Sequence, residues 1–239
     1  MLKTLLLGAA AAASLTFAGA ASAATYVSTL AHNDGNLSVD GNFGAVTIVE
    51  EDANNILVTV MLNAPLTLIV DTGKHNAFTF NLVDSPNSTV TIVEPVGGGS
   101  FTYAGEGAHS NPPFGNNAWT NAIECCGRGS SNGEPPPLVF RITNLSGITF
   151  AGVGATFDSD GKLLTTGTGN RFASTSAGWW FAVDTSDGSN TGAVAARDAF
   201  LVPTTTGAIP EPGTWALMIL GFGGAGAMLR RRRAASAFA

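Results

Sequence analysis

The sequence predicts an all-β protein, an antiparallel β-sandwich with jelly-roll-like connections, and three observations support this prediction. Apolar residues occupy every second position in short runs such as 56–62, 78–82 and 138–142. Turn-forming Asp-Gly, Pro and Asn residues separate these runs. No stretch of the body has clear helical spacing, although residues 191–200 are ambiguous. Period two with frequent turns is typical of half-buried strands in a sandwich or barrel.

The expected strands follow one another through the body. Alternation predicts them at residues 56–62, 78–82, 90–94, 138–143 and 179–184. Turns are expected between them because Gly, Asn, Asp and Pro supply the backbone geometry that tight turns need. The expected turns are Asp34-Gly35, Asp40-Gly41, residues 71–73, residues 85–87, Asp160-Gly161 and Asp187-Gly188.

The N-terminal residues 1–23 have the layout of a secretory signal peptide. Lys3 supplies a positive start, residues 5–13 are apolar, and Ala21-Ser22-Ala23 forms a site of small residues. This order is that of a signal removed on export, with cleavage between Ala23 and Ala24. A first transmembrane helix is the weaker interpretation because the run is rich in Ala and ends at a cleavage-type site.

The C-terminal region predicts one transmembrane helix at residues 213–229 with a basic tail at 230–233. An apolar run of about 17 residues would span about 25 Å as a helix, slightly less than a typical hydrocarbon core. Trp215 stands at its start, and Arg230, Arg231, Arg232 and Arg233 form a membrane stop behind it. Arginines are retained on the cytoplasmic side, so the body would face outward.

Five residues at the start of the C-terminal apolar segment and just before it match a known family motif: Pro210, Glu211, Pro212, Trp215 and Ala216. With the apolar segment and the arginines, residues 208–233 resemble the PEP-CTERM sorting domain in its Pro-Glu-Pro-x-x-Trp-Ala variant. The resemblance implies that the chain is a substrate of exosortase, a membrane-embedded cysteine protease, and that residues 210–212 are the processing site. It also implies export through the inner membrane of a Gram-negative bacterium that makes exopolysaccharide. The precursor would be a transient single-pass membrane protein, destined for the cell surface or the extracellular biofilm matrix.

The body, residues 24–207, is expected to be one ectodomain of acidic character. The chain has 11 basic and 17 acidic residues, and five of the basic ones lie in the two terminal signals. The body is therefore more acidic than the net charge of −6 for the whole chain. Nucleic acid is excluded as a partner because its binding needs basic patches.

Residues 104–137 are expected to form a long loop because they are rich in Gly, Asn, Ser and Pro. The loop contains Cys125 and Cys126, the only cysteines of the chain. Export into an oxidising compartment favours a disulfide. A bond between the two neighbours, bonds between molecules, and free thiols all remain open. Zinc is disfavoured because adjacent cysteines lack the ligand spacing of zinc sites.

Candidate chemical sites are few, and we expect neither an enzyme nor a cofactor. Asp158 and Asp160 weakly resemble a calcium loop, but the further ligands are missing and a turn is preferred. His32, His75 and His109 show no catalytic or metal-binding spacing. A hydrolase is the least favoured function because nucleophile motifs are absent.

Trp180 and Trp119 are the candidate sugar-binding rings. Trp179 and Trp180 are adjacent, so on a strand one ring faces the core and the other faces outward. An outward indole can stack on sugar rings; the alternative, slightly preferred, is that a loop covers it. The predicted function is a structural or adhesive role of an exported protein, and the alternative is a carbohydrate-binding module that interacts with exopolysaccharide.

Overall fold

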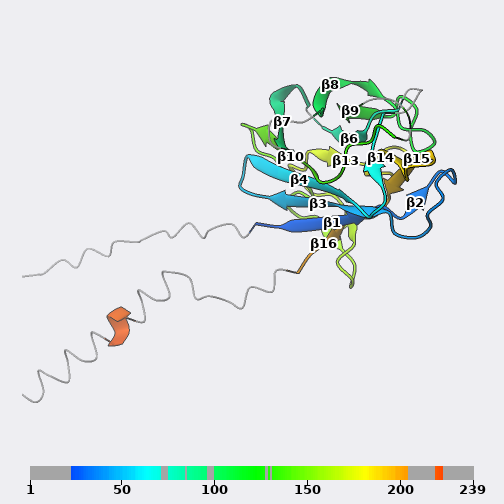
Figure 1. The fold of residues 1–239 in the computed structure, drawn as a ribbon. Coiled ribbons are helices and arrows are strands. Elements are labelled where there is room, and N and C mark those ends of the chain that lie inside the picture. The colour runs from blue at the N-terminus through cyan, green and yellow to red at the C-terminus, as the bar shows by residue number, and fades with distance from the viewer. Residues whose placement is uncertain are drawn as a thin grey trace, which may run out of the picture. The chain divides into compact units, whose positions relative to one another are not determined.

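The computed structural model describes residues 23–70, 75–83, 85–95, 100–126, 129, 131–203 and 219–222. Ala23–Thr204 forms one compact unit. The strands of this unit are shown in Figure 1. They are β1 (Thr25–Thr29), β2 (His32–Asn33), β3 (Gly44–Glu50), β4 (Asn55–Leu62), β5 (Thr67–Leu68), β6 (Phe78–Leu82), β7 (Ser88–Glu94), β8 (Thr102–His109), β9 (Trp119–Glu124), β10 (Leu138–Asn144), β11 (Thr156–Phe157), β12 (Leu163–Thr165), β13 (Phe172–Ala173), β14 (Phe181–Ser186), β15 (Thr191–Ala196) and β16 (Phe200–Leu201), with a 3₁₀ turn η1 at Ser85–Asn87.

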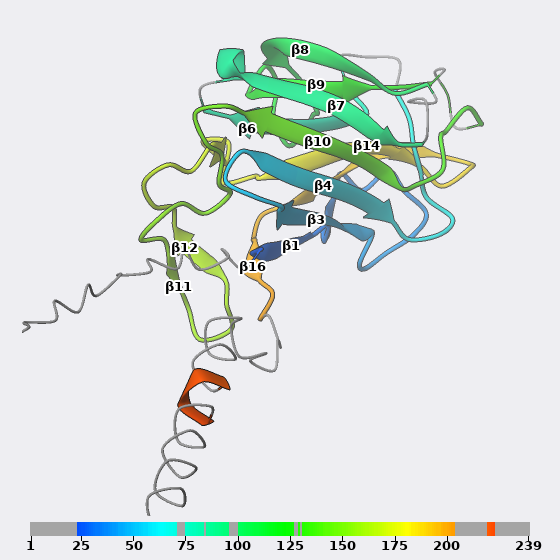
Figure 2. The same cartoon turned by 90° about the vertical axis from the view of Figure 1, so that its left-hand side faces the viewer.

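Two antiparallel sheets pack into a sandwich, as the sequence predicted. We call them sheet A, in the order β16-β1-β3-β4-β10-β7, and sheet B, in the order β2-β15-β14-β6-β9-β8. β5 pairs with β14 and β13 pairs with β6 at the margins of sheet B, while β11 and β12 form a separate small ribbon. Figure 2 shows the strands of sheet A side by side. The jelly-roll-like connectivity stays a prediction.

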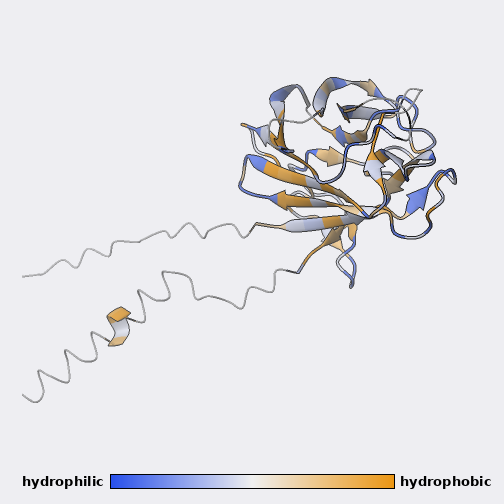
Figure 3. Ribbon diagram, viewed as in Figure 1, coloured by the Kyte–Doolittle hydropathy of each residue, from blue (hydrophilic) through white to orange (hydrophobic). Residues whose placement is uncertain are grey.

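The main core lies between the two sheets. Val58 on β4 and Phe140 on β10 are fully buried from sheet A, and Phe78 and Phe80 on β6 are fully buried from sheet B. The ring of Phe140 lies 5.7 Å from that of Phe78 and 5.3 Å from that of Phe80, so the two sheets meet through these aromatics. Figure 3 shows the hydrophobic colouring concentrated along strands such as β3 and β4. The predicted alternation at residues 56–62 and 138–142 is therefore confirmed.

The central strands of sheet B are buried on their other face as well. All five residues of β6 are buried, and so are all six of β14. On this second face Ala182, Ala193 and Ala195 pack under Phe114 and Trp119, which come from the β8–β9 connection and from β9. Short alanine side chains leave room for the loop, so residues 110–118 lie close against the sheet.

The predicted loop at 104–137 is wrong in part, because most of β8 and all of β9 fall in this range. β8 is an exposed strand with Gly at two positions and bulges in its pairing with β9, which hides its periodicity. β9 alternates poorly because Asn121 is buried where an apolar residue is expected. The ambiguous residues 191–200 contain strand β15 rather than a helix.

The terminal predictions lie mostly outside the described residues. These include the signal peptide before Ala23, the processing motif at residues 210–216 and the arginines at 230–233. Residues 219–222, inside the predicted span of 213–229, are helical. Across the ranges that the structure describes, no helix is both long and apolar enough to cross a bilayer.

Candidate functional site

A β-bulge sets the directions of the two adjacent tryptophans. Phe181 is the register partner of Ala196, and the backbone N–H of Trp180 donates to the carbonyl of the same Ala196 over 2.9 Å. Two residues of one strand thus oppose one residue of its neighbour, which is the arrangement of a bulge. Trp180 therefore shares the core side with Phe181, and its ring lies 5.2 Å from that of Phe150. Trp179 packs on the opposite side of sheet B.

Trp180 also lines a surface groove of about 570 Å³. The groove combines apolar side chains with hydroxyl and amide groups, and none of its lining residues is charged. Thr166 and Ser174 are exposed, and their hydroxyls make no hydrogen bond within the part of the chain that the structure describes. The lining residues are Val83, Leu163, Leu164, Thr165, Thr166, Asn170, Phe172, Ala173, Ser174 and Trp180.

The predicted surface platform at Trp119 is wrong because this side chain is only 1% exposed. Phe114 belongs to the same buried cluster and lies in a turn in which its backbone N–H donates to the carbonyl of Asn111, while the N–H of Asn111 donates to the carbonyl of Gly115. Trp179 is half-buried, since Phe114 contacts its ring edge-to-face and the Arg197 guanidinium lies 4.9 Å above its centroid. The preferred alternative, that a loop covers the outward ring of the adjacent pair, describes Trp179, which Phe114 of the β8–β9 connection contacts, whereas Trp180 lines a groove.

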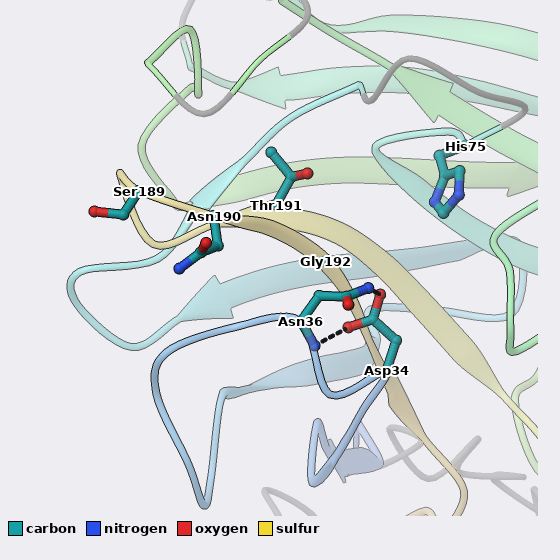
Figure 4. A pocket seen from close by; sticks show the side chains of 7 residues that line it. All are labelled: Asp34, Asn36, His75, Ser189, Asn190, Thr191 and Gly192. Atoms are coloured by element: carbon teal, nitrogen blue, oxygen red, sulfur yellow. Dashed lines mark hydrogen bonds between the residues drawn. The ribbon is translucent and has the colours of Figure 1, made fainter.

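A second, polar groove lies where the segment after β2 meets the β14–β15 hairpin. Asp34 accepts hydrogen bonds from the backbone and side-chain N–H groups of Asn36, as Figure 4 shows, and from the backbone N–H of Ala193. The groove has a volume of about 530 Å³. Its lining residues are Asp34, Asn36, His75, Ser189, Asn190, Thr191 and Gly192. The carboxylate of Asp34 is engaged by its own protein, so it serves to hold the segment to β15.

The three histidines lie in separate surroundings. His32 packs edge-to-face on Trp179, and His109 Nε2 lies 3.0 Å from the carbonyl oxygen of Gly105. His75 Nδ1 lies 3.6 Å from Oδ1 of the buried Asp184. Within the described ranges, no three residues of the types His, Cys, Asp and Glu are placed to hold a metal ion.

Asp158 and Asp160 occupy an exposed turn between β11 and β12. One carboxylate oxygen of Asp158 accepts the backbone N–H groups of Asp160 and Lys162 at 2.9 and 2.8 Å. This is the pattern of a side chain that stabilises its own turn. The geometry favours the turn that the sequence analysis preferred.

Cys125 and Cys126 form a disulfide with each other at the end of β9. Cys125 is buried and belongs to the main core, while Cys126 is partly buried. The two sulfur atoms lie 3.7 and 3.3 Å from the carbonyl oxygen of Leu68 on β5. Bonded sulfurs carry no hydrogen to donate, so these are packing contacts that place the disulfide against the neighbouring strand.

Glu50 is a half-buried carboxylate at the end of β3. Burial raises its pKa, although the backbone N–H of Phe150 donates to it over 2.7 Å and works in the opposite direction. Burial, together with the charge of Glu50, raises the pKa of Tyr26 to about 12. Glu51, the next residue, is exposed and forms a bidentate ion pair with Arg141, which lowers the pKa of Glu51.

Comparison with known protein families identifies the C-terminal region as a sorting motif. Residues 208–233 match the model of the PEP-CTERM protein-sorting motif. The chain carries an exosortase sorting signal. The motif implies that this PEP-CTERM-bearing protein is exported, carries a C-terminal sorting and anchoring segment, and is processed by exosortase. No curated protein and no solved structure matches the chain.

Proposed function

We propose that this protein is a surface or extracellular-matrix protein whose body acts by binding and structural contact, not by catalysis. The sorting motif at residues 208–233 carries this proposal, because its implied processing leaves a β-sandwich outside the cell. The acidic character of the chain supports a matrix role, since self-repulsion keeps such domains soluble until a specific partner binds.

The sorting step follows from the residues of the motif. Pro210 and Pro212 have fixed φ angles and lack backbone donors, and each favours extended geometry in the residue before it. The two prolines therefore favour an extended segment ahead of the predicted helix, and such a segment would fit the active site of a protease at the membrane surface. The four arginines at 230–233 stop transfer, so the processing segment is held on the outer side.

The test replaces Pro210 and Pro212 together by Ala in cells with active exosortase. We expect the full-length chain ending in its arginine-rich tail to accumulate in the inner membrane. Mass spectrometry of the C-terminus and membrane fractionation provide the readout. Pro203→Ala, which lies before the motif, is the matched control and should mature normally. Unchanged maturation of the double variant would contradict the proposal.

A second candidate function is binding of a neutral polysaccharide in the groove beside Trp180. The groove offers an indole next to hydroxyl and amide groups and has no charged lining residue. Sugar rings present apolar C–H faces and hydroxyl edges, so they match this lining, and the volume lies in the range of ligand pockets. The proposed location in a matrix would bring exopolysaccharide to this surface.

The second candidate is tested by Thr166→Ala combined with Ser174→Ala, since both residues are exposed and their removal spares the core. We expect a loss of retention on the exopolysaccharide of the producing strain, and Trp180→Ala should lose it more fully. Thermal unfolding verifies that each variant is folded. Ser189→Ala, in the polar groove, is the control. Unchanged retention with the folded double variant would exclude this groove as the sugar site.

A further inference from the structure

The two sheets have four edges, and three of them are protected against pairing with another chain. The edge strands β16 and β2 contain only two residues each. β8 is longer, but its pairing with β9 shifts at two places, Gly105 has a φ of +90°, and Glu106 places a charge on the strand. Short edges, bulges and charges are the devices by which proteins prevent edge-to-edge association.

β7 is the fourth edge, and it lacks these devices over most of its length. It contains seven residues, Ser88–Glu94, and only its last residue is charged. Within the described residues it pairs with β10 and with no other strand. The register with β10 is regular from Ser88 to Ile92 and shifts only at Val93. Within the described residues, the outward-facing backbone groups of residues 88–92 therefore pair with no other strand.

The side chains of β7 are arranged as in a strand that can pair with another strand. Thr89 and Thr91 are exposed on the outer face, while Val90 and Ile92 pack against the main core. Threonine and β-branched residues favour strand pairing, and threonines that face each other across strands form favourable pairs. Neither Lys nor Pro lies within β7 to oppose such pairing.

We infer that β7 pairs with β7 of a second copy, in an antiparallel arrangement whose two-fold axis lies at Val90. Ser88 then faces Ile92 of the other copy, and Thr89 faces Thr91. The only charged residue, Glu94, lies at opposite ends of the two strands, so the carboxylates of the two acidic bodies do not meet at the joint. The pairing joins the two A sheets into one continuous sheet, and the same patch serves both copies, as a two-fold interface requires.

The experiment uses charge exchange at this edge, with the exported protein purified in its mature form. Thr89 and Thr91 are replaced together by Lys in one variant and by Glu in another. Each double variant places like charges opposite each other in its own dimer, so we expect dimerisation to weaken about tenfold or more. An equimolar mixture places Lys opposite Glu and should restore the dimer. Sedimentation velocity over a range of concentrations measures these equilibria.

The control adds the same two charges on inner strands of sheet A. Thr29→Lys combined with Thr47→Lys alters the outer face of β1 and β3, away from the β7 edge. This variant should dimerise as the unmodified chain does. A chain that stays monomeric at every concentration would overturn the inference. Equal weakening in the control, or a mixture that fails to restore dimers, would also overturn it.

Discussion

Asp187 accepts a hydrogen bond from the backbone N–H of Ser38 over 2.7 Å, which ties the β14–β15 hairpin to a segment 149 residues earlier. The other carboxylate oxygen of Asp187 accepts the N–H groups of Ser189 and Asn190 at 2.8 and 2.7 Å. These bonds, with Asn190 contributing most and Ser38 next, hold the pKa of Asp187 well below its ordinary value. One side chain thus shapes its own turn and fixes the wall of the polar groove.

We predict that Asp187→Ala lowers the free energy of unfolding by about 1 kcal/mol. This value is at the low end for hydrogen bonds to a charged group, because the carboxylate lies near solvent. Since the folded pKa is depressed, the contribution is full above the ordinary pKa of 3.8 and is lost as pH falls through the lower folded pKa. Urea unfolding of both proteins, at neutral pH and at pH values below 3.8, measures this difference in the free energy of unfolding. Asp160→Ala, in another Asp-Gly turn, should change little; an equal loss there would refute the assignment.

For Glu50 we predict the opposite pH dependence of stability. Its pKa is raised by burial, so its contribution to stability is full below the ordinary pKa of 4.5 and is lost as pH rises through the folded pKa. Glu50→Gln removes the titration and retains an oxygen that can accept the Phe150 N–H. We therefore expect the unmodified chain to lose stability relative to this variant as pH rises from 4 to 7. A difference that is constant with pH would contradict the raised pKa.

The sandwich was predictable because its central strands follow simple alternation. At residues 56–62 one face meets the core and the other is partly or fully exposed, and at 138–142 the core side chains again alternate with Arg141 and Val139, so the period of two is visible in the sequence. The central strands of sheet B are buried on both faces. The buried Asp184 lies on the second face, beside Ala193, and the buried Asn121 lies opposite Phe80 on the core face. A polar residue in a buried position looks like a loop residue, which is why β9 was missed.

The candidate sites were only partly predictable. The sequence predicts the turns at Asp34 and at Asp187. It does not show that these two turns line the same polar groove, because that depends on the pairing of strands far apart in the sequence. The bulge at Trp180 interrupts the strict alternation that residues 179–184 predict. Three consecutive aromatic residues, Trp179 to Phe181, were the available signal, since regular alternation cannot place two large neighbours on one face.

The disulfide gives a prediction that separates the three states left open by the sequence. A digest of the exported protein, prepared without reduction, should contain the peptide of Cys125 and Cys126 two hydrogens lighter than its dithiol form. Alkylation before reduction should leave it unmodified, because no free thiol is present in the pair. Mass spectrometry provides the measurement. Cross-linked peptides from two chains, or alkylated cysteines, would contradict the intramolecular bond.

Phe114 is the residue on which the packing of the β8–β9 connection depends. It is 5% exposed, its ring centroid lies 4.9 Å from that of Trp179, and it belongs to the cluster that buries Trp119. Phe114→Ala should lower the free energy of unfolding by about 3 kcal/mol, because it leaves a cavity over two indoles. Tryptophan fluorescence should shift to the red as water reaches these rings. Leu145→Ala removes a comparable apolar side chain that is 86% exposed and should cost little. Equal losses in the two variants would show that Phe114 does not hold the connection against sheet B.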